Sequence, residues 1–441
     1  MERTNREVEI LITNPMSTFK QDPKLIMAIN KLFGNKEQDL TNNYNKVLTL
    51  PERKLTFSEV HNILTQSTSG RVRAGNNEPS NDDKNNNRKE IIKKVENILS
   101  EVNNAANNGL TPKFYLRNQK LWSNCIYDLD RVTLKSFSDA KKSIISYSST
   151  EDKNRFNTIV FVLSKVHELL SKNLTVTRRE LFYQNITRFH SQGNLDVAVR
   201  DVCCLLETPP WALGLTATAK GLIAGPLIMY MTDGTSLDCM TSGGTLIPQN
   251  INCVKEFKSS AKYILVVEKD AIFQKLLDEG TLIRLAPVII ITGKGYPDVC
   301  TRLLLCRLCA ELRLRALALV DADPHGFEIF LTYKYGSLAQ SHLSSSLACN
   351  SLALLGVRQH DVATLAPRQA RMLLSAFDKR KLNSLLRRPY LNTANGSRIK
   401  EELNAMLRSG EKAEIEAIAS TAAALCDAYL PSKIIEADFL G

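Results

Sequence analysis

The chain has 441 residues, which is too long for one compact core and predicts two or three domains. Hydrophobic residues make up 44% and charged residues 23%, so a fibrous or wholly disordered protein is excluded. The net charge of +11 favours a polyanionic partner, although basicity alone is equally consistent with a surface that is simply well solvated.

The sequence predicts an intracellular, soluble protein. No secretion signal is visible at the N-terminus, and apolar runs such as 288–291 are far too short to span a bilayer. Ten cysteines are scattered along the chain, several of them in apolar runs, which indicates reduced thiols. Cys306 and Cys309 have the spacing of a zinc or redox pair, but no second pair accompanies them. We expect them to be structural.

Residues 1–88 are predicted to form a flexible extension that docks a partner. Two short helices are expected in it, over about 23–33 and 58–65. From 71 to 88 the composition turns to Asn, Asp, Gly and Ser, with few apolar side chains to bury, so we interpret this stretch as a disordered linker. Order is expected to resume at Lys89.

Residues 89–250 are predicted to form a mainly helical domain. Apolar residues recur at three- and four-residue steps from Ile91 onward and again over 156–170, as on amphipathic helices. Thr177 and Glu180 have capping-box spacing and predict a new helix start after a short turn. A third helix is expected over 194–207.

Two apolar runs, 227–231 and 236–240, flank Asp233-Gly234 and predict a β-hairpin. Helix, turn, helix and hairpin in that order favour a winged helix-turn-helix module. An unrelated helical bundle with a hairpin is the alternative.

Residues 258–441 show an α/β pattern. Fully apolar strands are expected at 263–267, 288–291 and 316–320, each followed by a helix, which predicts a parallel sheet covered on both faces. The expected helices are 271–278, 297–312, 326–335, 401–407 and 414–425.

Acidic residues follow two of these strands. Glu268 comes directly after the first strand, and Asp321 and Asp323 come after the third. Carboxyl ends of parallel strands meet at one edge of a sheet, and hard oxygen donors gathered there suit Mg²⁺. A lone Asp-x-Asp is usually a loop or capping motif, so the prediction depends on the position of these acids after buried strands.

The segment after the second strand reads Gly-Lys-Gly-Tyr-Pro over 293–297. It lacks the spacing of a nucleotide-hydrolysing phosphate loop. Its glycines permit close approach to a phosphate and Tyr296 can stack on a sugar or base, but a simple tight turn is equally compatible. His325, next to the acids, is interpreted as structural rather than as a general acid.

Tyr183 is a candidate nucleophile, although a tyrosine on a helix is most often part of a core. Arg179 lies four residues earlier and therefore on the same helical face. A guanidinium beside a phenol favours the phenolate and also holds a phosphate, so the pair can attack phosphorus and form a phosphotyrosyl bond.

These motifs resemble the topoisomerase VI A-subunit family, and most closely its meiotic branch (Spo-eleven), from about residue 89 to the C-terminus. The matching segments, in chain order, are Arg-Glu-Leu-Phe-Tyr at 179–183, Ala-Lys-Gly-Leu-Ile-Ala-Gly at 219–225, Val-Val-Glu-Lys-Asp-Ala at 266–271, Ile-Thr-Gly-Lys-Gly-Tyr-Pro-Asp at 291–298, Leu-Val-Asp-Ala-Asp-Pro-His-Gly at 319–326, Leu-Arg-Arg-Pro-Tyr at 386–390, Lys-Ala-Glu-Ile-Glu-Ala at 412–417 and Tyr-Leu-Pro at 429–431.

The resemblance implies an N-terminal winged-helix (CAP-like) domain over 89–250 and a magnesium-binding Toprim domain with a helical C-terminal part over 258–441. It implies that Tyr183 is the nucleophile that becomes joined to a DNA 5′ end, with Arg179 supporting it. It further implies the remaining site residues: Glu268, Asp321 and Asp323 for the metal, and Lys220 and Tyr296 for DNA.

The resemblance also implies the setting of the reaction. A type II topoisomerase-like DNA transesterase, of the ATP-hydrolysing class, would make meiotic double-strand breaks in the nucleus. The active complex would be a homodimer on double-stranded DNA, with Tyr183 of one copy meeting the metal site of the other. Because no ATP-binding motif is visible, a topoisomerase VI B-like subunit is expected. Many relatives have two adjacent tyrosines where this chain has Phe182 and Tyr183.

Three other interpretations remain open at this stage. A somatic topoisomerase VI A-like subunit would relax and reseal DNA with an ATPase partner. A DNA-binding module would hold DNA without cutting it. A Toprim-type nuclease would use water and leave no covalent adduct.

Overall fold

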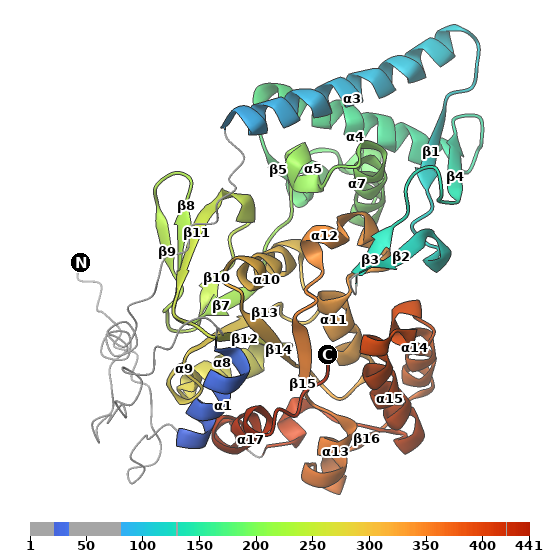
Figure 1. Cartoon of the computed structure of the whole chain (residues 1–441). Helices are drawn as coiled ribbons and strands as arrows, with labels where there is room; N and C mark the ends of the chain where they lie inside the picture. The colour runs from blue at the N-terminus through green and yellow to red at the C-terminus, as the bar shows by residue number, and fades with distance from the viewer. Residues whose placement is uncertain (1–21, 35–80, 129–130, 420) are drawn as a thin grey trace.

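The computed structural model describes residues 22–34, 81–128, 131–419 and 421–441 (Figure 1). The predicted helix at 58–65 and the first part of the predicted linker lie outside these residues. Two hydrophobic cores organise the rest. The smaller is built from residues between Ile91 and Leu215, and the larger mainly from residues after Ala219.

The smaller core lies between helices α3 (Asn81–Asn107), α4 (Lys153–Lys172), α5 (Arg178–Gln184) and α7 (Gln192–Leu206), with the short α6 (Ile186–Phe189) between the last two. The three long helices are the ones that the apolar periodicity predicts, and the apolar faces of α3, α4 and α7 meet in this core.

The linker prediction is wrong for residues 81–88, because α3 begins at Asn81 rather than at Lys89. The Arg88 guanidinium donates to the carbonyl oxygens of Leu170 (2.5 Å) and Ser171 (3.2 Å) at the end of α4. This contact holds the polar start of α3 against the end of α4. It joins residues far apart in the chain, so local composition could not predict it.

Four strands between α3 and α4 were not predicted. β1 (Lys113–Arg117) pairs antiparallel with β4 (Lys142–Ser146), and β2 (Cys125–Asp128) pairs with β3 (Arg131–Leu134). The backbone N–H of Val132 in β3 donates to Tyr335 O (3.1 Å) in the second half of the chain. These short strands therefore help to join the two cores.

The predicted hairpin is confirmed as β8 (Leu227–Met231) and β9 (Ser236–Asp238), which pair antiparallel. It also pairs with β11 (Val254–Ser259), and Leu227 and Met229 belong to the larger core. The hairpin therefore packs with the α/β half of the chain instead of with the helices that precede it. The winged-helix assignment stays a prediction.

The α/β half is built on a six-stranded sheet, and the predicted parallel strands are confirmed within it. β12 (Tyr263–Val267) lies between β13 (Val288–Thr292) and β14 (Arg315–Leu319). β15 (Leu352–Gly356) adds a fourth parallel strand, and β7 (Leu222–Ala224) and β10 (Thr245–Leu246) extend the other edge antiparallel. The predicted helices are α8 (Asp270–Asp278), α10 (Val299–Glu311) and α11 (Pro324–Lys334).

The C-terminal part is helical but differs from the prediction at 414–425, where no continuous helix forms. The helices are α13 (Gln359–Leu365), α14 (Ala376–Leu386), α15 (Ala394–Ser409), α16 (Ala422–Ala424) and α17 (Leu430–Ile435). Ala413 instead forms a β-bridge with Ala322, and Ile415 donates its N–H to Asp321. These tertiary bonds replace the helical hydrogen bonds that the residues favour locally.

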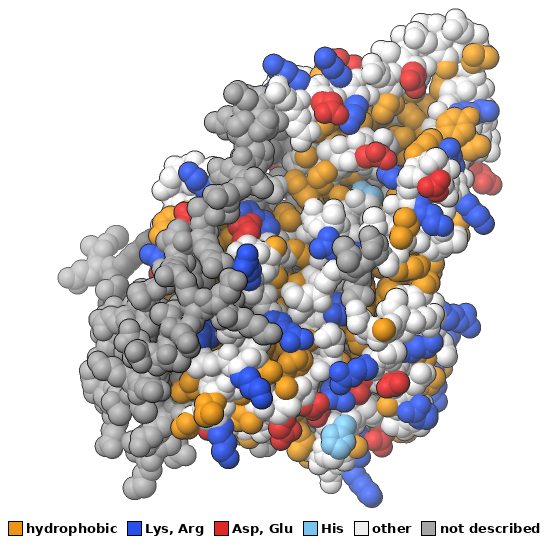
Figure 2. Space-filling model, viewed as in Figure 1, with side chains coloured by type: hydrophobic (Ala, Val, Ile, Leu, Met, Phe, Trp, Pro, Cys, Tyr) orange, Lys and Arg blue, Asp and Glu red, His pale blue; other side chains and the backbone are white. Residues whose placement is uncertain are grey.

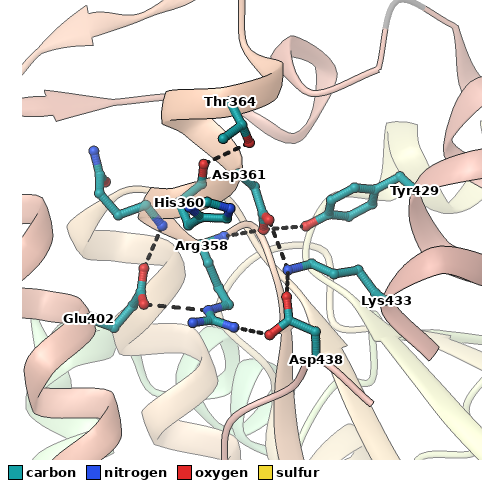
Figure 3. A network of polar contacts seen from close by, with 9 residues as sticks. Arg358, His360, Asp361, Thr364, Glu402, Tyr429, Lys433 and Asp438 are labelled. Carbon is teal, nitrogen blue, oxygen red and sulfur yellow. Dashed lines mark hydrogen bonds and ion pairs between the residues drawn. The ribbon is translucent and has the colours of Figure 1, made fainter. Parts of the chain in front are cut away.

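A network of ion pairs and hydrogen bonds joins α13, α15 and α17 (Figure 3). Lys433 Nζ contacts Asp361 Oδ1 (2.8 Å) and Asp438 Oδ2 (2.5 Å), and the Tyr429 hydroxyl donates to Asp361 Oδ2 (2.8 Å). The Arg358 guanidinium bonds Asp438 and Glu402 in the same network; its members are Arg358, Gln359, Asp361, Glu402, Tyr429, Lys433 and Asp438.

The predicted helix at 23–33 is confirmed as α1 (Pro23–Phe33), and it packs on its own chain. Leu25 and Ile29 are buried in the larger core, and the Phe33 ring stacks on that of Tyr263 with centroids 5.0 Å apart. α1 lies next to α17 (Figure 1). This helix is therefore part of the α/β half, although 46 residues outside the described part separate it from α3.

Ile29→Ala should weaken the docking of α1 by about 2–4 kcal/mol, because it leaves a cavity in a closely packed core. Hydrogen exchange of the amides in 23–33 is expected to become faster. Met27→Ala on the same helix is the matched control, since Met27 is 71% exposed. Equal hydrogen-exchange rates in the two variants would show that the burial of Ile29 does not stabilise the docking of α1.

Candidate active site

Tyr183 and Arg179 lie on the solvent face of α5. Thr177 caps this helix, accepting a hydrogen bond from the N–H of Glu180 (3.1 Å), which confirms the predicted helix start. The Glu180 carboxylate accepts from Gln184 Nε2 (3.3 Å), and the reciprocal bond of a capping box is not among those that the described residues of this helix form. Leu181 points into the helical core, which fixes the rotation of α5 and turns Tyr183 outward with 67% of its surface exposed. Tyr183 is therefore not a core tyrosine.

Arg179 is exposed on the same face, one turn before Tyr183. Within the described residues it forms no hydrogen bond or ion pair, whereas its neighbour Arg178 bonds Asp196 (3.1 Å). The guanidinium of Arg179 is thus available to an anionic ligand that approaches the phenol.

The three predicted acids lie together at the carboxyl edge of the sheet. Glu268 Oε2 accepts a hydrogen bond from the N–H of Asp321 (2.9 Å), and Asp321 Oδ1 accepts one from Ile415 (2.9 Å). Asp323 is the N-cap of α11, and its Oδ1 accepts from Gly326 (2.6 Å). A Cβ at Gly326 would lie 2.4 Å from Asp321 O, so this turn requires glycine.

Crowding raises the pKa of two of these acids. Burial, and then the charge of Asp321, raises the pKa of Glu268 to about 7. Burial also raises the pKa of Asp321 to about 6, against the hydrogen bond from Ile415 and the nearby Lys269. Two carboxylates held this close favour a proton or a cation between them.

The Lys269 ammonium group offsets part of the negative charge of these acids. Its Nζ lies 3.1 Å from Asp321 Oδ2, 3.1 Å from Glu414 Oε2 and 3.0 Å from Glu416 Oε2. Burial opposes its charge, but these acids raise the pKa of Lys269 above its ordinary value. Glu414 and Glu416 were not predicted as site residues, because only the fold brings them to Lys269. Their place in the matching 412–417 segment was the available signal.

The described residues contain no group of three or more His, Cys, Asp or Glu side chains arranged to hold a metal ion. The predicted three-acid ligand set stays a prediction: in this structure one oxygen of Asp323 caps α11 and one oxygen of Asp321 contacts Lys269. The donors nevertheless fit Mg²⁺, which usually takes only one or two protein carboxylates besides water and phosphate oxygens. Glu268 and Asp321 satisfy that requirement.

The two predicted DNA contacts lie beside these acids. The Lys220 side chain is exposed, with Nζ 3.1 Å from Lys294 O, and its N–H donates to Asp298 Oδ2 (2.9 Å). Tyr296 is 43% exposed, and its hydroxyl donates to Glu328 Oε2 (2.5 Å). The segment 293–297 forms a tight turn over Glu268, with Gly295 N–H donating to Glu268 O (2.8 Å).

The structure does not join the phenol to the acids. Tyr183 lies on a helix of the smaller core, and Glu268, Asp321 and Asp323 lie on the larger one. Among the residues described, Tyr183 makes its ring contact with Phe182, at 5.6 Å between centroids. Lys and Arg side chains are spread over the face shown in Figure 2, and no extended acidic surface is visible there.

Comparisons with protein families match both halves of the chain. The family model for the Toprim domain of the topoisomerase 6 A-subunit/Spo11 family matches residues 263–434, and the one described as "Type IIB DNA topoisomerase" matches 154–215. The two matches fall on the larger and smaller core. Within the described residues, no helix is both long and apolar enough to cross a membrane.

Three relatives illustrate the similarity. The mouse meiotic recombination protein SPO11 is 35% identical over 78% of this chain and 87% of its own. The DNA topoisomerase 6 A-subunit of Arabidopsis thaliana is 36% identical over 72% of this chain and 74% of its own. The Drosophila melanogaster meiotic recombination protein W68 is 37% identical over 66% of this chain and 86% of its own.

Glu268→Gln should stabilise the metal-free protein at pH 8 by about 1–3 kcal/mol and change it little at pH 5. The pKa of Glu268 is about 7 in the folded protein and 4.5 ordinarily, so the folded state favours the protonated side chain. The stability that this proton contributes is complete below pH 4.5 and is lost as the pH rises to about 7. Gln keeps the acceptor for Asp321 N–H without the charge.

Thermal unfolding in EDTA measures this effect, with Glu101→Gln, an exposed acid on α3, as the control. A Glu268→Gln variant that melts at a lower temperature than the parent protein at pH 8 would contradict the conclusion that the ionised Glu268 carboxylate destabilises the fold.

Proposed function

The chain belongs to the topoisomerase 6 A-subunit/Spo11 family, and on that premise we propose that it makes DNA double-strand breaks by transesterification, which initiates meiotic recombination. The observation that carries the proposal is the solvent-facing pair on α5, in which Tyr183 is 67% exposed and Arg179 lies one turn away on the same face. A phenol placed this way is accessible to a large polyanion.

In the proposed step the Tyr183 oxygen attacks a backbone phosphorus of DNA. The new bond joins the phenol oxygen to phosphorus, the bond from phosphorus to the 3′ oxygen breaks, and that oxygen leaves with a proton as the 3′ hydroxyl. The phenol proton passes to solvent or to a neighbouring base. Arg179 holds the phosphate and stabilises its developing charge. The phosphodiester energy is kept in the 5′-phosphotyrosyl bond.

Glu268 and Asp321 would hold Mg²⁺, with Asp323 two residues further along the same loop. The ion would supply positive charge to the phosphate oxygens. Lys269, which is also paired with Glu414 and Glu416, contacts Asp321 Oδ2, and the N–H of Ile415 donates to Asp321 Oδ1. These two contacts fix the orientation of the Asp321 carboxylate. The protein thus positions its acids before any ligand arrives.

We further propose that two copies act together, with Tyr183 of one copy meeting the acids of the other. The separation of the phenol and the acids onto two cores supports this arrangement. We also propose that the chain acts on double-stranded DNA in the nucleus, together with a topoisomerase VI B-like subunit. We also propose that α5 to α7 belong to a winged-helix domain, in which the hairpin at 227–238 is not the wing.

A somatic topoisomerase VI A-like role is the second candidate. It is favoured by the Arabidopsis topoisomerase 6 A-subunit, which is as similar to this chain as the meiotic relatives are. Relaxation and resealing of supercoiled DNA with a B-like ATPase subunit would support this role. Covalent protein–DNA ends confined to germ cells would support the meiotic one.

Tyr183→Phe should abolish covalent protein–DNA adducts, with a loss on the order of a thousandfold or more, because it removes only the attacking oxygen. Folding and DNA binding should remain. Labelled DNA that stays attached to denatured protein measures the adduct. Tyr115→Phe is the matched control, since Tyr115 is also exposed, at 47%. Adducts that persist in Tyr183→Phe would remove this residue from the reaction.

Arg179→Lys should lower the cleavage rate by about ten- to a hundredfold, since an ammonium keeps the charge but loses the planar fork that grips a phosphate. Cleavage kinetics at saturating DNA report this effect. Arg178→Lys serves for comparison because Arg178 is engaged with Asp196. Equal rates in both variants would indicate that Arg179 does not contact the reacting phosphate.

A further inference from the structure

Three ring side chains form an exposed cluster beside the acids, and two of them have no role in the proposed cleavage step. Tyr296 follows β13, His325 lies in the first turn of α11 and Phe377 lies in the first turn of α14. The Tyr296 and His325 rings meet edge to face at 6.4 Å. The His325 and Phe377 rings stack at 6.0 Å, with their planes 16° apart. We name these three residues the ring cluster.

The ring cluster presents open aromatic surface to solvent. Phe377 is 58% exposed and Tyr296 is 43% exposed, whereas His325 is half-buried between them. A single exposed ring is common on protein surfaces, but three adjoining rings from three different elements are not explained by chance exposure. Because more than half of Phe377 is exposed beyond its contact with His325, part of its ring surface is accessible to a flat ligand.

Neighbouring charges hold the ring cluster in place. The Glu328 carboxylate accepts from the Tyr296 hydroxyl (2.5 Å) and forms ion pairs with Lys381 and Arg388. The Tyr296 hydroxyl also lies 3.2 Å from His325 Nδ1. These bonds fix the rings of Tyr296 and His325, and Phe377 stacks on the fixed His325 ring, so a ligand that binds here loses less affinity to ordering the site.

The charge around Phe377 indicates the kind of ligand. The Arg380 guanidinium lies 6.0 Å from the centre of the Phe377 ring, and both Lys379 and Arg380 are exposed. A ligand that matches this surface has a flat aromatic face next to a negative charge, which describes a nucleotide. An intact duplex covers its base faces by stacking and exposes them only at its ends.

We propose that the ring cluster binds the terminal base of a DNA end by stacking on Phe377, with Arg380 on the adjoining phosphate. This inference rests on the proposed function, because cleavage beside Asp323 creates DNA ends within reach of α11 and α14. The ring cluster would then retain the product end after the backbone is cut, a task separate from the attack by Tyr183.

The test compares two DNA duplexes of one sequence by fluorescence anisotropy. The first has open ends with short single-stranded extensions, and both ends of the second are closed by polyethylene glycol linkers that carry no bases. The protein is the full chain with Tyr183→Phe, so that no covalent adduct forms. Phe377→Ala should bind the open-ended DNA roughly tenfold more weakly, as expected for one lost stack, and bind the closed DNA unchanged.

Two further variants sharpen the comparison. Phe377→Trp should bind the open-ended DNA at least as well as the parent does, because it keeps an aromatic face. Phe137→Ala should change neither affinity; Phe137 is the matched control, being 45% exposed with Lys142 Nζ 4.1 Å from its ring centre. Melting temperatures confirm that each variant is folded.

An equal loss on both DNAs, or no loss on either, overturns the role of the ring cluster while leaving the proposed function intact. Loss of self-association with unchanged DNA binding would likewise overturn it and assign Phe377 to a protein contact. A parent protein that binds neither DNA overturns the proposed function as well.

Discussion

The structure depends on the crowding of carboxylates at the carboxyl edge of a buried parallel sheet. β12 and β14 are adjacent and in register, with Val267 opposite Leu319, so the residues that follow them must meet. Glu268 and Asp321 are therefore forced together where water is largely excluded, and the pKa of each rises. Lys269 offsets part of this repulsion, and a divalent cation with a bound phosphate would offset the rest.

The C-terminal part of the chain keeps this edge in place. The N–H of Ile415 orients Asp321, and the bridge between Ala413 and Ala322 fixes the backbone of the acidic loop. Val320 exchanges hydrogen bonds with Gly356 and Val357 at the end of β15, and Val357 directly precedes Arg358 of the ionic network in Figure 3. A region that carries no reacting group thus determines where the acids stand.

The proposed nucleophile is governed by a separate constraint. The burial of Leu181 in the helical core turns the opposite face of α5 to solvent, and Tyr183 and Arg179 occupy that face. The phenol and the acids consequently belong to different cores of one chain. This division is the reason for proposing a two-copy arrangement, in which the phenol of one copy and the acids of the other would act on one phosphate.

Sequence by itself determined the features that depend on neighbours along the chain. Continuous apolar runs specified the central parallel strands, the Thr177 cap specified the start of α5, and a run of ordered motifs indicated the family, because each signal is local. Tertiary structure alone decided that α3 begins at Asn81, that residues 414–425 are not one helix and that the hairpin joins the α/β half. It also decided that Glu414 and Glu416 meet Lys269 and that Phe377 stacks on His325. Each of these depends on contacts between residues far apart in the chain, where long-range hydrogen bonds and burial outweigh local propensity.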